Sequence, residues 1–378
     1  MNPYLTLDDV DLDGVAVLVR SDLNVPLENG KVGDDFRIRS ALPTLDRLVE
    51  AGAAVSVCSH LGRPDGPDPS LSLDPVARRM RELTAHRVGF ERGGEITVLE
   101  NTRFLAGETR NDASTAERLA DGFDLFVQDA FGSVHRAHAS TVGVAERVKS
   151  VAGPLLDAEL QALGRFLSEP DRPYTIVLGG AKVSDKLGVI ENLLPKVDRM
   201  LIGGGMCFTF LAARGYEVGD SLLQEDMVDK VAGLFDGPNG RKIILPVDIA
   251  VGEEFSADTS RTVVGASEIP AGTIGLDIGP GTSAGFRELI ESSANVFWNG
   301  PMGVFEWETF RRGTDLIARA LAACQGFTAV GGGDSAAALR VLGLENTVSH
   351  LSTGGGASLE LLEGKILPGV AVLERWVQ

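Results

Sequence analysis

Short apolar runs alternate with longer amphipathic segments along most of the chain. The short runs are typical of buried strands, and the longer segments carry apolar residues at the spacing of one helix face. This alternation predicts parallel sheets built from right-handed strand–helix–strand crossovers, so the expected fold class is α/β. In the first half, strands are predicted at Val15–Arg20, Ala53–Cys58, Ile96–Leu99 and Leu125–Gln128, and helices at Arg37–Ala51 and Asp74–Ala85.

One amphipathic segment, Pro154–Glu169, stands between two series of predicted strands. Leu156, Leu160 and Leu163 fall on one helical face, and Pro170 follows the segment directly. Proline cannot continue a helix, so it predicts the end of this one. A single helix between two strand–helix series is a natural connector, and we place a domain boundary there.

The stretch Thr175–Lys186 carries the clearest chemical signal in the second half. A short apolar strand ends in a Gly-Gly turn, and Lys182 and Lys186 follow. Free backbone N–H groups at such a turn suit a phosphate group. The two lysines have i, i+4 spacing, so on a helix they would share one face. The simpler alternative is a tight turn followed by two solvated lysines.

Later apolar runs also end in glycine-rich turns. Glycine is needed where the backbone approaches a ligand closely or takes a positive φ, so these turns predict a nucleotide lying across the rim of a second parallel sheet. Gly331–Ala336 formally fits the G-x-G-x-x-A pattern, which leaves an NAD-dependent dehydrogenase as an alternative. That pattern is expected after the first strand, where this chain has Arg20–Asn24 instead. Asp334 fits better as a metal-nucleotide contact at a helix N-terminus.

Charge and composition narrow the range of partners. The formal net charge of −18 makes nucleic acid and an anionic membrane poor partners for the surface as a whole. No apolar run reaches about 18 residues, and the acidic N-terminus lacks the pattern of a secretory leader. Cys58, Cys207 and Cys324 are far apart, as expected of reduced core residues. We therefore expect a cytoplasmic protein with a local basic pocket for any anionic substrate.

Arginine and histidine side chains gather where the strands of the first half end. Ligands of parallel sheets bind outside the carboxyl ends of the strands, so this placement predicts a pocket for a small anion. Arginine suits phosphate or carboxylate because its planar fork donates two hydrogen bonds. The alternative is that the arginines form surface ion pairs and the histidines are core or capping groups. The residues are Arg20, His60, Arg63, Arg103, His135, Arg136 and His138, with Arg37 at the start of the first helix.

A series of segments, in order along nearly the whole chain, resembles the signature segments of the phosphoglycerate kinase family. The resemblance implies two Rossmann-like lobes, each a parallel sheet flanked by helices, joined by a hinge helix. The segments are Arg20–Pro26, Ser59–Pro64, Asp129–Gly132 with His135–His138, Gly179–Lys186, Trp298–Pro301, Gly331–Asp334 and Ser352–Leu361.

The resemblance also implies a domain plan and a reaction. The N-terminal lobe would bind 3-phosphoglycerate and comprise residues 1–154 with 366–378, the hinge helix would span 155–169, and the nucleotide-binding lobe would span 170–365. The implied reaction is reversible, Mg²⁺-dependent phosphoryl transfer between ATP and the carboxylate of 3-phosphoglycerate, which is a step of glycolysis and gluconeogenesis. Transfer would be direct and in line, with hinge closure, in a monomer whose partners are ATP or ADP and 3-phosphoglycerate or 1,3-bisphosphoglycerate.

Individual roles carry over from the family position by position. The catalytic residues would be Arg37, Lys182 and Gly333. The substrate-binding residues would be Asp22, Asn24, Arg37, His60, Arg63, Arg103 and Arg136, with Arg20 as a neighbouring structural partner. The nucleotide-binding residues would be Lys182, Lys186, Gly203, Gly204, Gly279, Asn299, Glu306, Gly332, Gly333, Asp334 and Ser335, with Asp334 also the metal contact.

An argument from charge alone is consistent with this chemistry. A carboxylate acceptor is already ionised at pH 7, so no general base is required. The sequence accordingly shows no obvious base or nucleophile arrangement, and the remaining task is electrostatic stabilisation of a migrating phosphoryl group. A non-catalytic metabolite-binding member of the same fold is the second alternative, and the intact charged residues count against it.

Overall fold

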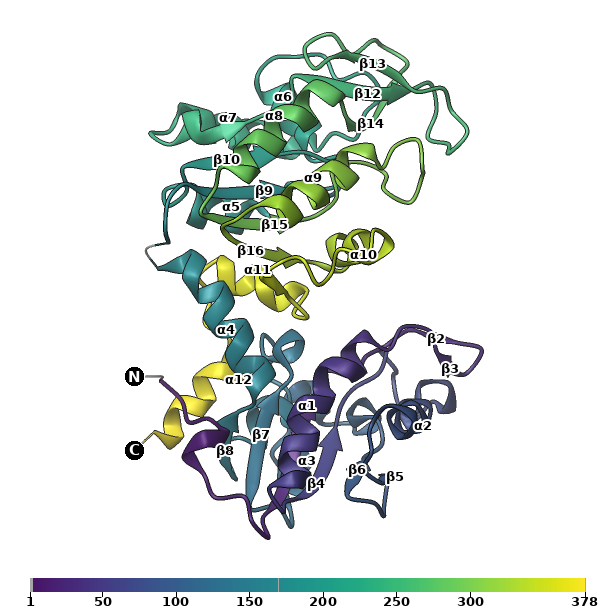
Figure 1. Cartoon of the computed structure of the whole chain (residues 1–378), viewed down its shortest axis with the longest axis vertical. Coiled ribbons are helices and arrows are strands. Elements are labelled where there is room, and N and C mark those ends of the chain that lie inside the picture. The colour runs from purple at the N-terminus through teal and green to yellow at the C-terminus, as the bar shows by residue number, and fades with distance from the viewer. Residues whose placement is uncertain (1–2, 169, 378) are drawn as a thin grey trace. The chain divides into compact units, whose positions relative to one another are not determined.

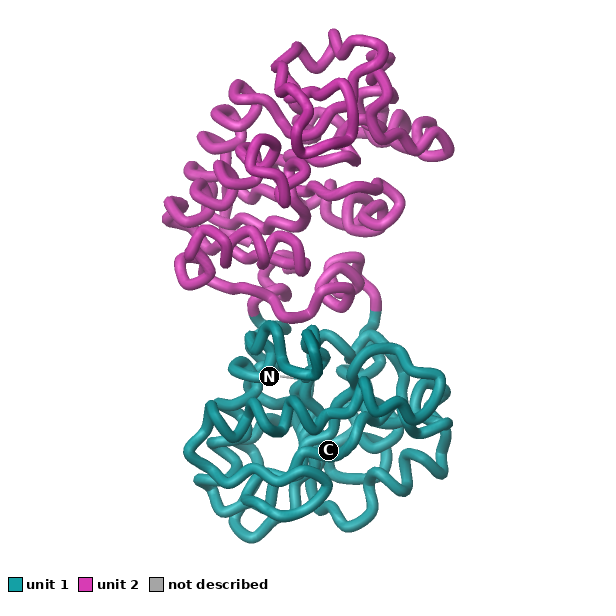
Figure 2. Tube along the Cα trace, turned by 90° about the vertical axis from the view of Figure 1, so that its right-hand side faces the viewer, with its two compact units in different colours: residues 1–161, 366–378 teal, residues 162–365 magenta. Residues whose placement is uncertain are grey.

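A computed structural model describes residues 3–168 and 170–377, and the chain divides into two compact units. Unit 1 comprises residues 1–161 and 366–378, and unit 2 comprises residues 162–365 (Figure 2). The chain therefore returns to unit 1 after unit 2 is complete. None of the helices in the described residues combines the length and apolar character that crossing a bilayer would require.

Unit 1 is built on a six-stranded sheet in the order β5-β6-β4-β1-β7-β8 (Figure 1). Every pairing in it is parallel. Strands of parallel sheets are covered on both faces, and Val17, Leu18 and Val19 of β1 are accordingly fully buried. The strands are β1 (Ala16–Ser21), β4 (Ala54–Cys58), β5 (Val88–Phe90), β6 (Ile96–Val98), β7 (Leu125–Asp129) and β8 (Lys149–Ala152), beside a short antiparallel pair, β2 (Leu27–Glu28) and β3 (Lys31–Val32).

Helices flank this sheet and complete the core of unit 1. Ile38, Leu42 and Leu45 recur at helical spacing on one buried face of α1. The strands and helices predicted for the first half are present, and their ends differ from the predicted ends by no more than two residues. The helices are α1 (Phe36–Glu50), α2 (Asp74–Leu83), α3 (Ala113–Ala120) and, from the returning segment, α12 (Pro368–Ala371).

Unit 2 contains a second six-stranded parallel sheet, in the order β11-β10-β9-β15-β16-β17. Its central strands are again buried, as Ile176 and Val177 of β9 and Trp298 of β15 illustrate. The strands are β9 (Tyr174–Leu178), β10 (Arg199–Ile202), β11 (Ile243–Ile244), β15 (Asn295–Asn299), β16 (Phe327–Gly331) and β17 (His350–Leu351). The helices are α5 (Leu187–Leu193), α6 (Cys207–Ala213), α7 (Val228–Asp236), α8 (Pro280–Glu291), α9 (Arg312–Ala323), α10 (Gly333–Val341) and α11 (Gly356–Leu362).

A separate three-stranded antiparallel sheet adds to unit 2 and was not predicted. It has the order β13-β12-β14, formed by β12 (Asp248–Gly252), β13 (Thr262–Gly265) and β14 (Ile274–Ile278). Gly279 follows β14, so this glycine-rich turn does not lie at the rim of the parallel sheet where such turns were expected. This antiparallel sheet also forms one wall of a cavity that is described below.

The helix between the two series of strands is α4 (Pro154–Leu167). The division between the units falls within it, after residue 161, so its first half belongs to unit 1 and its second half to unit 2. The predicted end of this helix, Glu169, lies outside the described residues. The functional limits expected for the two lobes, at residues 154–155 and 169–170, remain a prediction.

Candidate active site

The predicted anion pocket of unit 1 lies along one edge of its sheet. β6, β4, β1 and β7 are consecutive neighbours and run parallel, so their carboxyl ends share that edge. The predicted residues follow these ends: Arg103 after β6, His60 and Arg63 after β4, Asp22 and Asn24 after β1, and Arg136 after β7.

Three of the loops at this edge meet at Gly62. Asn24 Oδ1 accepts a hydrogen bond from the Gly62 N–H at 2.9 Å, and the Arg103 guanidinium donates to the Gly62 carbonyl. Gly62 has a φ of +64°, a conformation that only glycine adopts at little cost, and a Cβ there would lie 2.8 Å from the Leu71 side chain. The turn therefore holds Asn24 and Arg103 beside the loop that carries Arg63.

Arg20 is fully buried within β1. Its guanidinium lies 3.8 Å from Asp22 Oδ1 and donates to His60 Nδ1 at 3.0 Å. Its Nε donates to Ser140 Oγ at 3.0 Å, and that hydroxyl donates to the buried carboxylate of Glu108 at 2.5 Å. Two carboxylates thus offset a buried cation that would otherwise be costly.

The ring of His60 lies among positively charged groups. Burial, followed by the charges of Arg20, Arg103 and Arg37 and by His138, lowers the pKa of His60 well below its usual range. His60 is therefore neutral at pH 7. The same electrostatic influence shows that Arg37, at the start of α1, lies close to the other predicted substrate residues.

One carboxylate oxygen of Asp22 accepts a hydrogen bond, and the other has no partner among the described residues. Oδ1 accepts a hydrogen bond from Ser133 Oγ at 2.5 Å, whereas the buried Oδ2 has no partner in the described part of the chain. A buried acceptor left unpaired is unfavourable, so a ligand hydroxyl would be a stabilising partner here. Arg63 and Arg136 are exposed at the same edge, and burial lowers the pKa of Arg103. This site suits a small molecule that carries both hydroxyl and anionic groups.

His135 and His138 lie in the loop after β7, and one of them is close to a buried carboxylate. His138 Nδ1 lies 3.9 Å from Glu108 Oε1. Burial is the main cause that lowers the pKa of His138, and the Glu108 carboxylate opposes it. His135 is half-buried in the loop before it. His138 therefore belongs to the buried charge network that contains Arg20.

In unit 2 the Gly-Gly turn follows β9 as predicted, and Gly180 has a φ of +89°. The expectation that Lys182 and Lys186 share a helical face is wrong, because α5 begins only at Leu187. Lys182 is exposed in the turn before the helix, whereas Lys186 is buried. The two lysines therefore have different environments and different chemical possibilities.

Lys186 forms a buried pair with Asn299. Its ammonium donates to Asn299 Oδ1, and Asn299 Nδ2 is buried without a hydrogen-bond partner among the described residues. Burial lowers the pKa of Lys186 to about 8, and the carboxylates of Asp185 and Asp334 oppose this shift. A buried ammonium beside an unused amide N–H is a favourable arrangement for phosphate oxygens.

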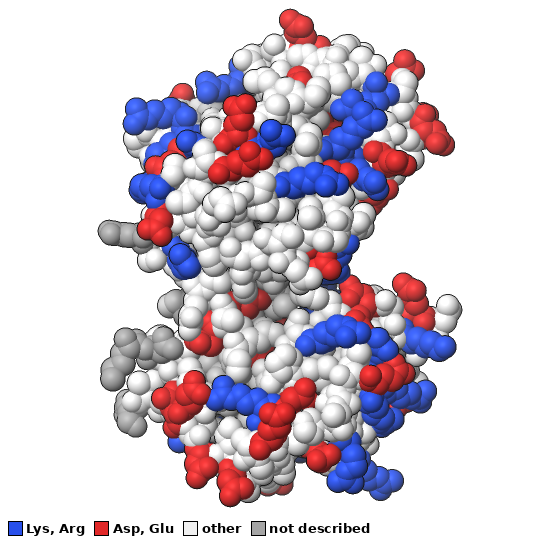
Figure 3. Space-filling model, viewed as in Figure 1, with Lys and Arg blue, Asp and Glu red and all other residues white. Residues whose placement is uncertain are grey.

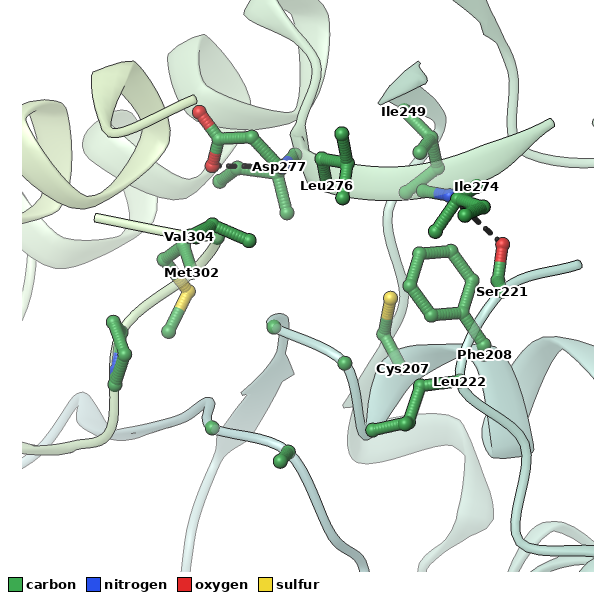
Figure 4. Close-up of a pocket in the computed structure, with 18 of the residues that line it drawn as sticks. Cys207, Phe208, Ser221, Leu222, Ile249, Ile274, Leu276, Asp277, Met302 and Val304 are labelled. Carbon is green, nitrogen blue, oxygen red and sulfur yellow. Dashed lines mark hydrogen bonds between the residues drawn. The ribbon is translucent and has the colours of Figure 1, made fainter. Parts of the chain in front are cut away.

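A cavity of about 680 Å³ adjoins this turn within unit 2 (Figure 4). Its volume lies in the range of small-molecule and cofactor sites. Gly204, Glu306 and Asp334 are the predicted nucleotide residues that line it. The other predicted nucleotide residues lie outside its lining, and they are Lys182, Lys186, Gly203, Gly279, Asn299, Gly332, Gly333 and Ser335.

Most of the cavity wall is apolar, and the sequence did not reveal it. The antiparallel sheet forms one side and α6 with the following loop forms the opposite side, while the segment after β15 closes a third (Figure 4). The only signal for these residues was their apolar character, which does not distinguish a cavity wall from a core. The missed residues labelled in the figure are Ile249, Ile274, Leu276, Cys207, Phe208, Leu222, Met302 and Val304.

Two of the predicted nucleotide residues, Ser335 and Gly279, contact the protein around the cavity and help to fix its backbone. Ser335 Oγ accepts a hydrogen bond from the Gly300 N–H at 2.7 Å. Gly279 packs against Asp248, and a Cβ there would lie 2.2 Å from the Asp248 carboxyl carbon. Asp277 similarly turns its carboxylate away from the cavity (Figure 4). One of its oxygens accepts from the Gly313 N–H at 2.8 Å. These residues shape the backbone around the cavity.

Acidic and basic side chains are interspersed over both units on the face shown in Figure 3. The anion-binding groups are therefore local features within an acidic molecule. Unit 1 offers a basic site with an unused carboxylate oxygen, and unit 2 offers a glycine-rich turn, a buried lysine and a cavity. Together the fold and these sites are those expected of a two-domain α/β phosphotransferase that uses a nucleotide and a small anion.

Comparison with known proteins makes this class specific. The family model described as "Phosphoglycerate kinase" matches residues 7–365. A phosphoglycerate kinase of Salinispora arenicola is 53% identical over 98% of this chain and 99% of its own length. One of Rubrobacter xylanophilus is also 53% identical, over 97% of each chain.

Solved structures agree with the sequence relatives. Phosphoglycerate kinase from Coxiella burnetii superposes with a TM-score of 0.91 at 41% identity, over 100% of both chains. The enzyme from Pyrococcus horikoshii gives a TM-score of 0.85 at 32% identity, over 98% of both chains. The chain therefore belongs to the phosphoglycerate kinase family, and the fold and family implied by its motifs are confirmed. Its activity is that of a glycolytic transferase that uses ATP or ADP as a substrate.

Proposed function

We propose that unit 1 holds the three-carbon substrate, 3-phosphoglycerate or 1,3-bisphosphoglycerate. The observation that carries this assignment is one edge of the sheet that holds both Asp22 Oδ2, which has no hydrogen-bond partner among the described residues, and several arginines. Asp22 would accept from the substrate hydroxyl, and Asn24 and His60 would contact its carboxyl end. The arginines would hold its anionic groups, and they are Arg37, Arg63, Arg103 and Arg136.

Unit 2 would hold ATP or ADP in the same proposal. The base would enter the apolar cavity, and Glu306 at its lining would accept from the ribose hydroxyls. The phosphates would lie toward the buried Lys186 and Asn299, with exposed Lys182 beyond them. The proposed phosphate position lies near the Gly-Gly turn after β9, where free backbone N–H groups favour an anion. The backbone of Gly332 and Gly333, at the start of α10, would contribute there.

The carboxylate of Asp334 would hold Mg²⁺ together with the nucleotide phosphates. Asp334 is exposed in the first turn of α10 and lines the cavity. No group of three or more His, Cys, Asp or Glu residues suited to a metal occurs in the described residues. A single carboxylate fits, because Mg²⁺ is commonly bound by one or two carboxylates plus substrate phosphates. When bound, the ion would neutralise part of the phosphate charge.

Phosphoryl transfer would then be direct, from the nucleotide to the substrate carboxylate. The acceptor is ionised at pH 7, so the neutral His60 is not needed as a base. Lys182 and Arg37 would contact the transferring group in line between the two oxygens and stabilise its charge in the transition state. The N–H of Gly333 would donate to the same group.

Water must be kept from the reacting phosphoryl group, or ATP would be hydrolysed. We propose that α4 acts as a hinge and that the two units close only when both substrates are bound. A single chain contains both proposed sites, so the functional form would be a monomer. The cytoplasm, where glycolytic substrates occur, would be its location.

A coupled assay with ATP, Mg²⁺ and 3-phosphoglycerate tests this proposal. We expect ADP formation that depends on all three components. The control is 2-phosphoglycerate, whose phosphate lies on the wrong carbon for the arginines of unit 1. The assignment of unit 1 would be overturned if no ADP formed with either compound, or if both compounds gave ADP at the same rate.

A further inference from the structure

The contact between Arg20 and His60 fixes where the protons of the imidazole lie. Arg20 Nη2 lies 3.0 Å from His60 Nδ1. A guanidinium has five N–H donors, no acceptor and a pKa too high to lose a proton. The hydrogen bond can therefore exist only if His60 Nδ1 offers its lone pair. In a neutral imidazole the proton must then be on Nε2.

The rest of the network fixes the orientation of Arg20. Its Nη1 donates to the Ser21 carbonyl at 2.5 Å, its Nη2 also approaches Ser133 Oγ at 3.4 Å, and its Nε donates to Ser140 Oγ. Each serine hydroxyl donates its own proton to a carboxylate, Asp22 for Ser133 and Glu108 for Ser140. Both hydroxyl oxygens must therefore accept from Arg20, and the guanidinium cannot turn without breaking these bonds.

We propose that Arg20 is a positioning residue that locks His60 as its Nε2–H tautomer, so that His60 serves the substrate as a neutral hydrogen-bond donor. This inference rests on the proposed substrate site of unit 1 and specifies how one residue of that site works. The donor would point at an anionic oxygen of the three-carbon substrate, which accepts but cannot donate. Arg20 thereby acts on the substrate through His60 without touching it.

A protonated His60 would be inconsistent with its surroundings. It would carry a second N–H at Nδ1, directly opposite a guanidinium N–H. The charged and titratable groups that influence the ring are Arg20, Arg37, Arg103 and His138, three of them permanent cations. The ring is also half-buried, and its desolvation further disfavours the charged form. The donor role of His60 should therefore persist unchanged across the working pH range.

Long-range ¹H–¹⁵N spectra of the full chain with ¹⁵N-labelled histidine test the tautomer directly. We expect one pyridine-type signal for Nδ1 and one pyrrole-type signal for Nε2, unchanged between about pH 6 and pH 8, where free histidine titrates. The signals are assigned by their loss in His60→Asn. A Nδ1–H tautomer, or titration of both nitrogens in this range, would overturn the proposal.

A matched pair of substitutions tests the donor. The amide nitrogen of His60→Gln reaches the position of Nε2, whereas the carbonyl oxygen of His60→Asn reaches only that of Nδ1. We expect the Kd for 3-phosphoglycerate to rise no more than about threefold in the Gln variant and at least about tenfold in the Asn variant, the usual loss for a hydrogen bond to a charged group. Equal losses in both variants would contradict a Nε2 donor.

Arg20→Met tests the positioning role. Without the guanidinium, His60 should show a mixture of tautomers in the same spectra, and the Kd for 3-phosphoglycerate should rise. Nucleotide affinity, a property of unit 2, should not change. A single Nε2–H tautomer in a folded Arg20→Met protein would show that Arg20 does not fix the ring. If this variant does not fold, the wild-type spectra and the Gln–Asn pair still decide whether His60 carries its proton on Nε2, as its contact with Arg20 requires.

The outcomes separate this inference from the proposed function. Wild-type protein that fails the 3-phosphoglycerate assay would contradict the proposed function. Normal turnover with a Nδ1–H tautomer would contradict only the inference about Arg20 and His60.

Discussion

Arg37 is the second residue of α1, close enough to His60 to influence its pKa. We expect Arg37→Ala to lower kcat by at least about 100-fold, because one transition-state contact is typically worth this much. Arg39→Ala is the matched control, since Arg39 lies on the same helix and is exposed in an ion pair with Asp35. Steady-state kinetics measure both. Turnover near the wild-type value in Arg37→Ala would remove this residue from the mechanism.

Lys182 is exposed in the turn before α5, and it therefore remains available to a migrating phosphoryl group. Lys182→Ala should lower kcat by about 100-fold while the Kd for ADP changes little. Calorimetry gives the Kd and single-turnover kinetics give the rate, with the exposed Lys230→Ala as control. Loss of ADP binding with normal turnover at saturation would assign Lys182 to nucleotide binding instead.

The environment of Lys186 predicts a pH dependence of nucleotide affinity. Burial lowers its pKa to about 8, and a bound polyphosphate would raise it again. The empty protein loses this charge as the pH rises through about 8, so binding must take up a proton. The Kd for ADP should then rise by up to about tenfold per pH unit between pH 8 and 9.5, with about half a proton taken up at pH 8.

Lys186→Arg is the matched variant for this effect, because arginine stays charged throughout that range. Calorimetry in two buffers with different ionisation enthalpies measures the proton uptake. We expect the variant to bind ADP with a Kd that is flat between pH 7 and 9.5. The same slope in wild type and variant would assign the pH dependence to another group.

At the scale of elements, the carboxylate of Asp129 connects β7 to α4. Its Oδ1 accepts from the N–H groups of Leu155 and Leu156, in the first turn of α4, at 2.9 and 3.2 Å. This is a helix cap made by a residue distant in sequence. Asp129→Ala should therefore lower the free energy of unfolding by about 1–2 kcal/mol in urea denaturation. Asp129→Asn, which keeps the acceptor, should retain most of this contribution.

The same carboxylate should make stability depend on pH. Burial is the main cause that raises the pKa of Asp129 to about 6, above the value near 4 of an unfolded chain. The folded state then binds the proton more tightly, so this contribution to stability is present below about pH 4 and is lost as the pH rises through 6. The stability of wild type relative to Asp129→Asn should fall by up to about 3 kcal/mol between pH 4 and pH 7.5. An unchanged difference would show that Asp129 does not titrate in this range.

The elements of the parallel sheets could be predicted because covered strands are continuous apolar runs. The strand before Gly279 was expected, but its place in an antiparallel sheet with β12 and β13 was missed, because an apolar run of five residues does not show which strand it pairs with or in which direction. The charged residues that gather at one edge of the first sheet were predicted from their position at strand ends, and their roles remain predictions. The cavity wall was not, because residues such as Phe208 and Leu276 have the same apolar character as core residues.

Local spacing also misled at one place. Lys182 and Lys186 have helical spacing, but α5 begins one residue after Lys186. The backbone there is held by the turn, where the Gly180 N–H donates to the Pro301 carbonyl at 2.8 Å. That contact joins residues far apart in sequence, so no local pattern could reveal it.

At the scale of the whole molecule, the returning segment is part of the fold of unit 1. Leu373 is fully buried, and the Trp376 indole donates to the Ala145 carbonyl at 2.9 Å. We expect Leu373→Ala to lower the free energy of unfolding of unit 1 by about 2–5 kcal/mol, the usual cost of a buried leucine. Val377→Ala, at an exposed position of the same segment, should change it by no more than about 0.5 kcal/mol.

Hydrogen exchange measured by mass spectrometry can assign the loss to a unit. Peptides of unit 1 should exchange faster in Leu373→Ala, while peptides of unit 2 should be unchanged. Faster exchange confined to unit 2 would contradict the assignment of the returning segment to unit 1.

This return has a consequence for synthesis on the ribosome. Domains commonly fold in the order in which they are translated, from the N-terminus onward. Here residues 162–365 form one uninterrupted unit, whereas unit 1 needs residues 366–378, which are translated later. All of unit 2 is therefore synthesised before unit 1 is complete, although unit 2 begins later in the sequence. A chain that ends before residue 366 would contain all of unit 2 beside an incomplete unit 1, so chaperones would find exposed core in unit 1 only.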